Sequence, residues 1–443
     1  MKFAFTGDSI LNGVVRDATS DRFHEIVKRT QSADITLTHL ETLIHDYDGP
    51  EVYPAAEAGW TWMRSPRSIL DELSWMGFQG VTLASNHTLD YSYGGMKSTI
   101  AALQDAGLAH AGAGNDLEEA SAPAIIGTDD FKVGVISMAS SFQPFSRAGQ
   151  PRPDIKGRPG LNPLRFRYVA DEEKLAQLRD MWKSMGWWIL QVADDEWWAH
   201  PAGLHVSVTK VRLGDVDGLV TDVDPLDLER HRRSIEKAKA MCDFVMVHVH
   251  NHEWDPKQGI HAPPEFSKQF ARASVDAGCD LFVAEGGHAS LRGIEVYNGK
   301  PVFYDPGDFF RMSDNVTKFP TDFFERTHFN LPNYQTATVE EGITARKNSG
   351  ADNPENPPGG YFCGKVEGGF VPICNINASG AIDQIELHPY DWSMSKEQAG
   401  HVGIPLAIEG EQADALIAYE QELSDPFGTT IRNENGVGII DVR

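Results

Sequence analysis

Polar side chains that could bind a metal or transfer a proton recur at five places in the N-terminal two thirds of the chain. Each group follows a short apolar run and holds carboxylate, carboxamide or imidazole side chains. In chain order the groups are Asp8, then His39 and Glu41, then Asn86, His87 and Asp90, then His250, His252 and Glu253, and finally Glu285 and His288. These ligand types suit divalent Mn, Fe, Zn or Ni, and the lack of cysteine among them argues against a structural zinc site. The pattern predicts a centre for one or two divalent cations.

Every group also has an ordinary structural explanation. Asp8 could belong to a turn, and Asn86 could cap the helix that follows it. His250 and His252 could be a hydrogen-bonded pair in the core, and residues 285–288 could form a glycine-rich turn. Such a coincidence would have to occur separately at five strand ends, so we favour one shared site.

Alternating strands and helices must position these groups. Strands are predicted by apolar runs at residues 2–6, 34–38, 81–84, 131–138, 244–249 and 281–284, and helical patterns cover residues 21–31, 66–76, 94–107, 226–241 and 264–277. Ser65 and Pro66 are interpreted as the N-cap and first-turn proline of the second helix. Residues 293–297 and 302–304 predict an antiparallel pair that turns at Asn298 and Gly299. This order predicts an α/β sheet, in which ligands bind beyond the carboxyl ends of the strands, so the polar groups should share one crevice.

The alternation breaks between about residues 145 and 225. Residues 147–167 are rich in proline, glycine and basic side chains, and half of the ten tryptophans fall between Trp182 and Trp198. We interpret this segment as an insertion or lid, and its tryptophans fit a local core or a subunit interface better than a cover over substrate. The predicted catalytic domain spans residues 1–345, and residues 346–443 add strands and a helix that pack on the same domain.

The composition restricts the partners. The 39 basic residues against 64 acidic ones give a formal net charge of −25, which argues against binding to nucleic acid or an anionic membrane. No apolar run approaches the roughly 18 residues of a membrane span, and the N-terminal run is too short for a secretory signal. We therefore expect a cytoplasmic protein that acts on a small molecule or a short peptide. The acidic surface does not forbid a homodimer.

Several of these segments resemble the motifs of the CapA/PgsA family, which is named for capsule and poly-γ-glutamate synthesis. The segments are Thr-Gly-Asp (residues 6–8), His-Leu-Glu (39–41), Leu-Ala-Ser-Asn-His-Thr-Leu-Asp-Tyr (83–91), His-Asn-His-Glu (250–253) and Gly-Ile-Glu-Val-Tyr-Asn-Gly-Lys-Pro (293–301). The resemblance runs from residue 1 to about residue 325. Because that family is related to calcineurin-like metallophosphatases, the resemblance implies a four-layer αββα sandwich.

Two positions depart from the family pattern. Glu285 stands where the family usually has the first histidine of Gly-His-x-Pro-His, and Asp308 stands where the family has asparagine in Tyr-Ser-Leu-Gly-Asn-Phe. A carboxylate in place of imidazole could favour a harder ion, or it could reduce a two-metal site to one metal.

The residues suggest a division of roles. The metal ligands would be Asp8, Glu41, Asn86, His250, His252 and His288, with Glu285 as a possible further ligand. His87 is placed to protonate a leaving group, Asp90 to orient it, and Glu253 is an alternative base. The residues assigned to substrate binding are His39, Arg64, Arg292, Trp254 and Asp308.

These roles predict a metal-dependent hydrolase, in which a metal-activated water attacks a γ-glutamyl amide or a phosphoester in a small, anionic substrate. Two alternatives stay open. One is a non-catalytic protein of capsule assembly that binds polymer, and the other is metal-assisted lyase chemistry on a small carboxylate.

Overall fold

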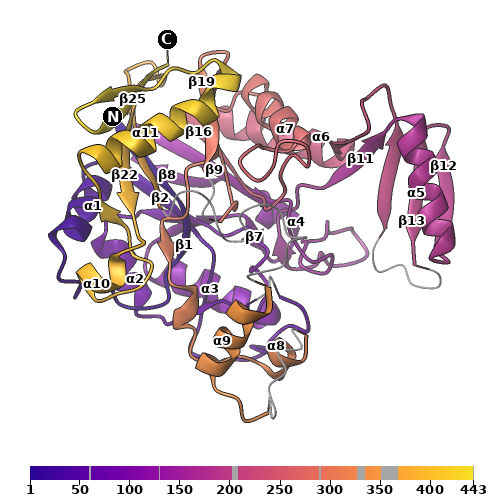
Figure 1. Ribbon diagram of the computed structural model, residues 1–443, viewed down its shortest axis with the longest axis horizontal. Coiled ribbons are helices and arrows are strands. Elements are labelled where there is room, and N and C mark those ends of the chain that lie inside the picture. Colours follow the sequence, from indigo (N-terminus) through magenta and orange to yellow (C-terminus); the bar gives the residue numbers. More distant parts are fainter. Residues whose placement is uncertain are drawn as a thin grey trace.

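Two large β-sheets form the body of the protein, and a smaller sheet projects from it (Figure 1). The structure is a computed structural model that describes residues 1–58, 61–128, 130–201, 208–288, 291–326, 335–350 and 368–442. The side chains of residues 314, 326 and 346–350 are not described. The predicted α/β class is confirmed.

The first sheet is built around the N-terminal strand. Its central strands β1 (Lys2–Ile10), β2 (Ile35–Leu40), β5 (Gly80–Thr82) and β6 (Ala109–Ala111) are parallel. Strands β21 (Gly368–Ile376), β22 (Ile382–Asp391), β25 (Val437–Asp441) and β24 (Arg432–Glu434) extend it on the other side of β1 as antiparallel neighbours. Two short strands, β20 (Phe310–Arg311) and β23 (Leu406–Ala407), pair with β1 and β22. The C-terminal part of the chain therefore joins the same sheet as the N-terminus.

The second sheet has the order β18, β19, β17, β16, β9, β8. These strands span Arg292–Tyr297, Lys300–Asp305, Leu281–Glu285, Phe244–His250, Lys132–Ala139 and Ala124–Gly127. Strands β9, β16, β17 and β19 are mutually parallel, whereas β18 and β19 form the predicted antiparallel pair. Its turn residues Asn298 and Gly299 both have positive φ angles, 50° and 71°, as a tight hairpin requires.

The two sheets pack face to face through a shared apolar core. Phe3 and Phe5 of β1 lie against Phe244 of β16 and Phe303 of β19, with ring centroids 5.5 and 4.9 Å apart. On the far side of the first sheet a second core includes residues of α1 (Asp21–Gln31), α2 (Ile69–Trp75) and α3 (Ser92–Asp105). On the far side of the second sheet lie α6 (Pro225–Lys239) and α7 (Glu265–Asp276). The central strands, such as β2, β16 and β17, are thus buried on both faces.

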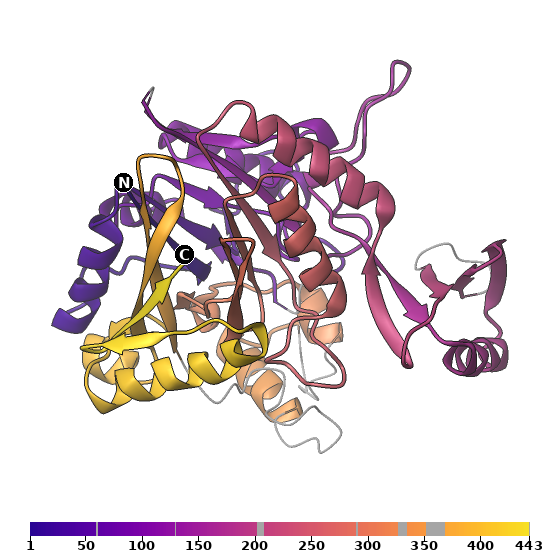
Figure 2. The same ribbon diagram turned by 90° about the horizontal axis from the view of Figure 1, so that it is seen from above.

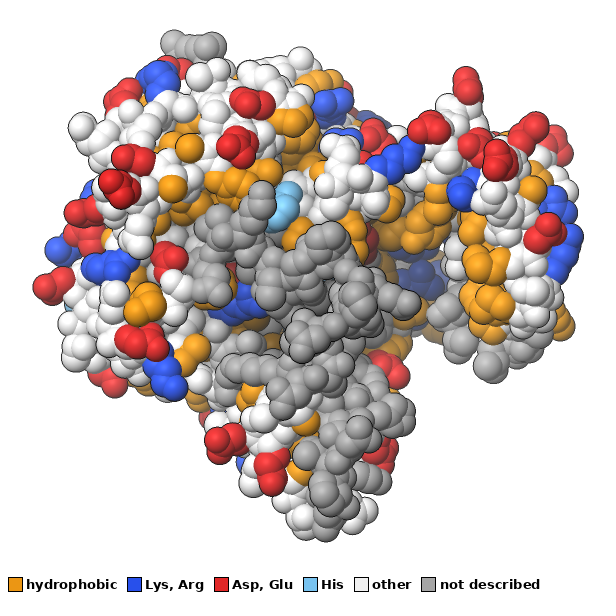
Figure 3. Space-filling view, viewed as in Figure 1, with side chains coloured by type: hydrophobic (Ala, Val, Ile, Leu, Met, Phe, Trp, Pro, Cys, Tyr) orange, Lys and Arg blue, Asp and Glu red, His pale blue; other side chains and the backbone are white. Residues whose placement is uncertain are grey.

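The projecting sheet occupies most of the segment interpreted as an insertion. It contains β11 (Phe166–Ala170), β12 (Trp188–Ala193), β13 (Glu196–His200), β14 (Thr209–Leu213) and β15 (Leu219–Val223), with α5 (Glu172–Ser184) packed on it. Trp182 and Trp197 are buried in a separate small core there. Trp188 is 53% exposed, and Figure 3 shows further hydrophobic side chains on the surface of this part. Figure 2 shows the sheet set apart from the body, and its role as a lid stays a prediction.

The C-terminal helix α11 (Glu411–Ser424) joins the two halves of the body. It packs on β18, where the backbone N–H of Ile294 donates to Oγ of Ser424 at 2.9 Å. The remaining strands and α-helices are β3 (Leu43–Ile44), β4 (Arg64–Ser65), β7 (Ala113–Gly114), α4 (Leu117–Ala120), β10 (Gly160–Leu161), α8 (Thr321–Arg326), α9 (Val339–Gly350) and α10 (Ser395–Ala399), and two 3-10 helices span Ser313–Asn315 and Asp425–Phe427.

Two local predictions were wrong. The first strand was predicted to end before Asp8, but β1 continues to Ile10 because β20 pairs with Ser9 and Ile10. Ser65 was predicted to cap the second helix, but it lies in β4, and its hydroxyl donates to the carbonyl of Leu11. Helix α2 begins four residues later, without a side-chain cap.

Candidate metal centre

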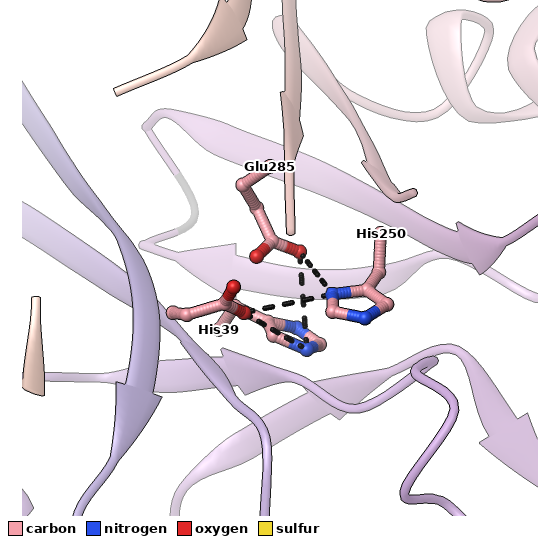
Figure 4. Close-up of side chains that lie close together, drawn as sticks. His39, His250 and Glu285 are labelled. Carbon is pink, nitrogen blue, oxygen red and sulfur yellow. Dashed lines mark hydrogen bonds and ion pairs between the residues drawn. The ribbon is translucent and has the colours of Figure 1, made fainter. Parts of the chain in front are cut away.

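Four buried ligand-type residues meet between the two sheets, at the carboxyl ends of their strands. Asp8 of β1 stands beside His39 of β2 in the first sheet, and His250 of β16 stands beside Glu285 of β17 in the second. One ligand atom from each lies within 4.8 Å of the others (Figure 4). Nδ1 of His250 is 3.0 Å from Oε1 of Glu285 and 3.5 Å from Oδ1 of Asp8. We call these four residues the inner cluster.

A second group adjoins the inner cluster on its more exposed side. Glu41, Asn86, His252 and His288 form this outer cluster. Oε1 of Glu41 lies 3.5 Å from Nε2 of His250, 3.6 Å from Nε2 of His288 and 3.9 Å from Nε2 of His252. The side chains of His252 and His288 are 20% and 13% exposed, whereas those of the inner cluster are at most 1% exposed. The outer cluster therefore has access to solvent.

The donor set fits a divalent cation. Within the described part of the chain, both carboxylate oxygens of Asp8 and of Glu41, Nε2 of His39 and Oε2 of Glu285 are buried without a hydrogen-bond partner. A buried charged or polar group without a partner is destabilising by several kcal/mol, roughly 1–3 even for a neutral group. A cation among these atoms would satisfy them, and carboxylate with imidazole is a donor set for Mn, Fe, Zn or Ni.

The carboxyl groups oppose one another electrostatically. Burial raises the pKa of Glu41 and of Glu285 well above the ordinary value, and the charge of Asp8 adds to both shifts. Burial acts in the same direction on Asp8, but interactions with Glu285 and His250 outweigh it and lower the pKa of Asp8. The proximity of the Asp8, Glu41 and Glu285 carboxyl groups therefore favours the binding of a proton or a cation among them.

Most imidazoles of the centre are held neutral, as metal ligation requires. Burial lowers the pKa of His39, His250 and His252, and neighbouring histidines add to the shift in His39 and His252. His288 differs: burial acts against its charge, yet Glu41 and Asp308 raise the pKa of His288 to about 10. In the absence of a bound cation, the positive charge of protonated His288 therefore offsets the negative charge of Glu41 and Asp308.

His87 and Asp90 form a pair beside the outer cluster. Nδ1 of His87 lies 2.5 Å from Oδ2 of Asp90, and Nε2 lies 3.7 Å from Oε1 of Glu41. The same oxygen of Asp90 accepts a hydrogen bond from the backbone N–H of Met63 at 2.7 Å, which fixes the carboxylate. The pair therefore presents Nε2 of His87 to the centre.

The residues predicted to bind substrate fall in different places. Asp308 is buried, with Oδ1 3.5 Å from Nδ1 of His288, and thus lies among the ligand-type groups, as His39 does. Arg292 is 1% exposed, and its Nε donates to the carbonyl of Ile260 at 3.0 Å. Both of its terminal nitrogens lack a hydrogen-bond partner among the residues that the structure describes. Burial lowers the pKa of Arg292, although Asp305, Glu253 and Glu285 act in the opposite direction. Arg292 is therefore a buried cation whose charge interacts with Asp305, Glu253 and Glu285.

Arg64 is engaged elsewhere. It pairs with Asp46 and lies over the ring of Tyr47, 4.7 Å from its centroid. Within the described part of the chain, none of its hydrogen bonds or ion pairs reaches either cluster. Trp254 is partly buried beside Glu253 in sequence.

Glu253 is fixed by two hydroxyl groups. Oε2 of Glu253 accepts hydrogen bonds from Ser140 at 2.7 Å and from Ser141 at 2.9 Å. The Ser141 hydroxyl also accepts from the backbone N–H of His252. Glu253 thus holds the loop that carries His252.

Two further residues belong to the centre but carried no predicted role. Nε2 of His248 is 3.0 Å from Oε1 of Glu285, and Asp305 accepts hydrogen bonds from the backbone N–H groups of Gly287 and Gly307. Burial raises the pKa of Asp305 to about 7 against the effect of Arg292. The alternation of histidines along β16 was the available signal for His248, because residues two apart share a face of a strand.

Comparison with known sequences assigns the chain to a family. The chain belongs to the family described as bacterial capsule synthesis protein PGA_cap, which matches residues 2–313, so the resemblance to CapA is confirmed. It is 32% identical over 439 residues to the uncharacterized protein y4sH of Sinorhizobium fredii, covering 98% of this chain and 91% of that protein. It is 28% identical over 229 residues to a probable polyglutamine synthesis accessory protein of Mycobacterium tuberculosis, covering 51% and 43%.

A shorter match is 40% identical over 86 residues to the PGA biosynthesis protein CapA of Bacillus subtilis, covering 19% of this chain and 21% of that protein. Among solved structures, a hypothetical protein from Thermus thermophilus aligns with a TM-score of 0.36 at 9% identity, covering 88% of this chain and 98% of that one. A putative 5'-nucleotidase from Staphylococcus aureus aligns with a TM-score of 0.33 at 12% identity, covering 70% and 49%. Both structures are too distant to support a conclusion about this chain. None of the described helices has the length and apolar character needed to cross a membrane.

Proposed function

We propose that the protein is a metal-dependent hydrolase of a small, anionic substrate. The observation that carries this proposal is the convergence of buried carboxylate oxygens, which lack hydrogen-bond partners among the described residues, with neutral imidazoles beside the His87 and Asp90 pair. One or two divalent cations, Mn, Fe, Zn or Ni, would be held by the inner and outer clusters. The packing of two sheets between outer helices supports a four-layer αββα arrangement of the metallophosphatase kind.

A cation bound there would lower the pKa of a coordinated water from 15.7 to about 7 and so supply a nucleophile near neutral pH. The chain supplies the remaining groups. Nε2 of His87 faces the centre and would carry the proton that the leaving group takes, while Asp90 fixes the orientation of the ring. Glu253 would have a positioning role: the hydroxyls of Ser140 and Ser141 donate to its carboxylate, which holds the loop that carries His252.

Arg292 would attract the anionic group of the substrate. Its terminal nitrogens have no hydrogen-bond partner in the described ranges of the chain, and the surrounding centre is otherwise rich in carboxylates. The names of the relatives, which refer to PGA biosynthesis and polyglutamine synthesis, support a γ-glutamyl amide as the bond that is cleaved. A phosphoester fits the same arrangement of ligands.

A cleavage panel with product identification tests the proposal. Protein reconstituted with each of the four metals is offered phosphomonoesters, phosphodiesters and γ-glutamyl amides. Products that together exceed the substrate by one water establish hydrolysis, whereas cleavage without a gain in mass shows a lyase. Failure to cleave any substrate with metal bound would favour the second candidate, a polymer-binding assembly protein. The relative named as an accessory protein and the acidic Glu285 and Asp308 favour that candidate.

A further inference from the structure

We propose that the inner cluster is a cation position of its own, closed to solvent and completed by His39, while the outer cluster holds a more exchangeable ion. The inference deepens the proposed function and rests on it, since both require a metal centre. It changes the role of His39 from substrate binding to metal ligation.

The hydrogen bonding of His39 fits a ligand. Nδ1 of His39 lies 2.9 Å from Oγ1 of Thr82. Nε2 of His39 is buried with no hydrogen-bond partner among the described residues, 3.7 Å from Oδ1 of Asp8 and 3.9 Å from Oε1 of Glu285. Histidine ligands commonly donate their other ring N–H to an oxygen, which fixes the tautomer. If the Thr82 hydroxyl accepts from Nδ1, the lone pair of Nε2 is directed at the two carboxylates.

His248, on the other side of the inner cluster, has a similar arrangement of contacts. Nδ1 of His248 lies 3.2 Å from Oγ of Ser137, and its Nε2 lies 3.0 Å from Oε1 of Glu285. The rings of His39 and His248 are stacked, with centroids 4.8 Å apart. Glu285 of the second sheet thus lies between His248 and the Asp8 and His39 side chains of the first sheet, with its Oε1 hydrogen-bonded to Nδ1 of His250.

The two clusters differ in exposure and in donors. The inner cluster offers two imidazoles and two carboxylates, a complete set of four protein ligands, and its side chains are at most 1% exposed. Sites with four protein ligands are closed, whereas sites that react with substrate keep an open position. The outer cluster, with His252 and His288 partly exposed, is the open one. An ion in the inner cluster should therefore leave slowly and one in the outer cluster quickly.

The test measures metal content and metal release in the full chain rather than activity. Elemental analysis gives the equivalents bound after reconstitution with zinc, and excess chelator gives the time course of release. We expect two equivalents in the wild type, released in a fast and a slow step. His39→Ala should lose the slow step and one equivalent, whereas His252→Ala should keep the slow step.

Two further variants keep the test decisive. Thr82→Val removes the partner of His39 with little change in size, and it should accelerate the slow step by about 10- to 100-fold. His231→Gln replaces a buried histidine on α6 that hydrogen-bonds to the carbonyl of Pro163, and it should leave both steps unchanged. Unaltered stoichiometry and release in His39→Ala and Thr82→Val would overturn the inference while leaving the hydrolase proposal intact. A wild type that binds no metal would overturn the proposed function itself.

Discussion

Oδ1 of Asn86 lies 2.8 Å from Nε2 of His250, although 164 residues separate them in the chain. Asn86 follows β5 of the first sheet, and His250 ends β16 of the second. This contact joins the carboxyl ends of the two sheets where the ligand-type side chains converge. The centre therefore exists only when both sheets are packed together.

The pair of His87 and Asp90 should affect proton transfer and not metal binding. His87→Ala is expected to lower kcat by about 10²- to 10⁴-fold, because a positioned acid contributes that much to a reaction. The loss should be smaller for substrates with a good leaving group, which needs no proton. Rates with substrates of graded leaving-group pKa, measured beside metal content, check this. An equal loss of kcat for all substrates in the series would contradict the role of His87. Glu253→Gln serves as the comparison variant, and we expect it to lower kcat less than His87→Ala does.

Arg292 should govern affinity for the anionic group. Arg292→Met removes the buried guanidinium with partial retention of volume, and we expect KM to rise by 10-fold or more while metal content is kept. Arg64→Met is the matched control, since Arg64 pairs with Asp46, and KM should change less. Steady-state kinetics on the charged substrate and on a neutral analogue separate the two variants. An equal effect of Arg292→Met on both substrates would show that it acts through the fold.

The turn after Glu285 requires glycine. Gly286 has a φ of +111°, and a Cβ there would stand 3.1 Å from Cε1 of His250 and from the backbone of Asn251. Gly286→Ala should therefore displace His250 and weaken metal binding by at least 10-fold. Gly259→Ala is the control, because Gly259 has a φ of +90° and no described residue lies within 4 Å of its Cβ position. It should cost only about 1 kcal/mol of stability from backbone strain. Competition with a fluorescent chelator measures the metal affinity of each variant. Equal affinities of Gly286→Ala and Gly259→Ala would refute the steric argument.

His231 should make stability depend on pH away from the metal centre. Burial, with Arg230, lowers the pKa of His231 to about 3. Below the unfolded value of about 6.5 the unfolded chain binds a proton that the folded chain does not, so stability falls as pH falls from 6.5 toward 3. Urea unfolding of chelator-treated protein should show a slope about 1.4 kcal/mol per pH unit smaller for His231→Gln in this window. Parallel slopes in the two proteins would contradict the shift.

Much of the centre could be predicted because strand ends are local features of a sequence. Helix α1 has the predicted bounds, and α/β alternation correctly indicated that Asp8, His39, His250 and Glu285 meet. The register that sets Asp8 beside His39 depends on strand pairing, which a linear pattern does not contain. The continuation of β1 through Asp8 also required knowledge of its distant partner β20.

The roles of individual residues were harder to predict than their presence. His39 and Asp308 are ligand types that the sequence could equally place toward substrate, and only their distances to Asp8 and His288 group them with the ligands. Arg64 pairs with Asp46, which lies in a different segment of the sequence. The residues around Arg64 therefore could not reveal that its side chain is held away from the centre. The substrate, the compartment and the possible homodimer stay predictions.

Elemental analysis of the purified wild type beside Asn86→Ala and His250→Ala tests the central claim most directly. These variants remove the two atoms that join the sheets at the centre, and His231→Gln controls for the loss of a buried imidazole. We predict at least one equivalent of Mn, Fe, Zn or Ni in the wild type and in His231→Gln, and a lower metal content in both Asn86→Ala and His250→Ala. A wild type without stoichiometric metal, even after reconstitution, would contradict it.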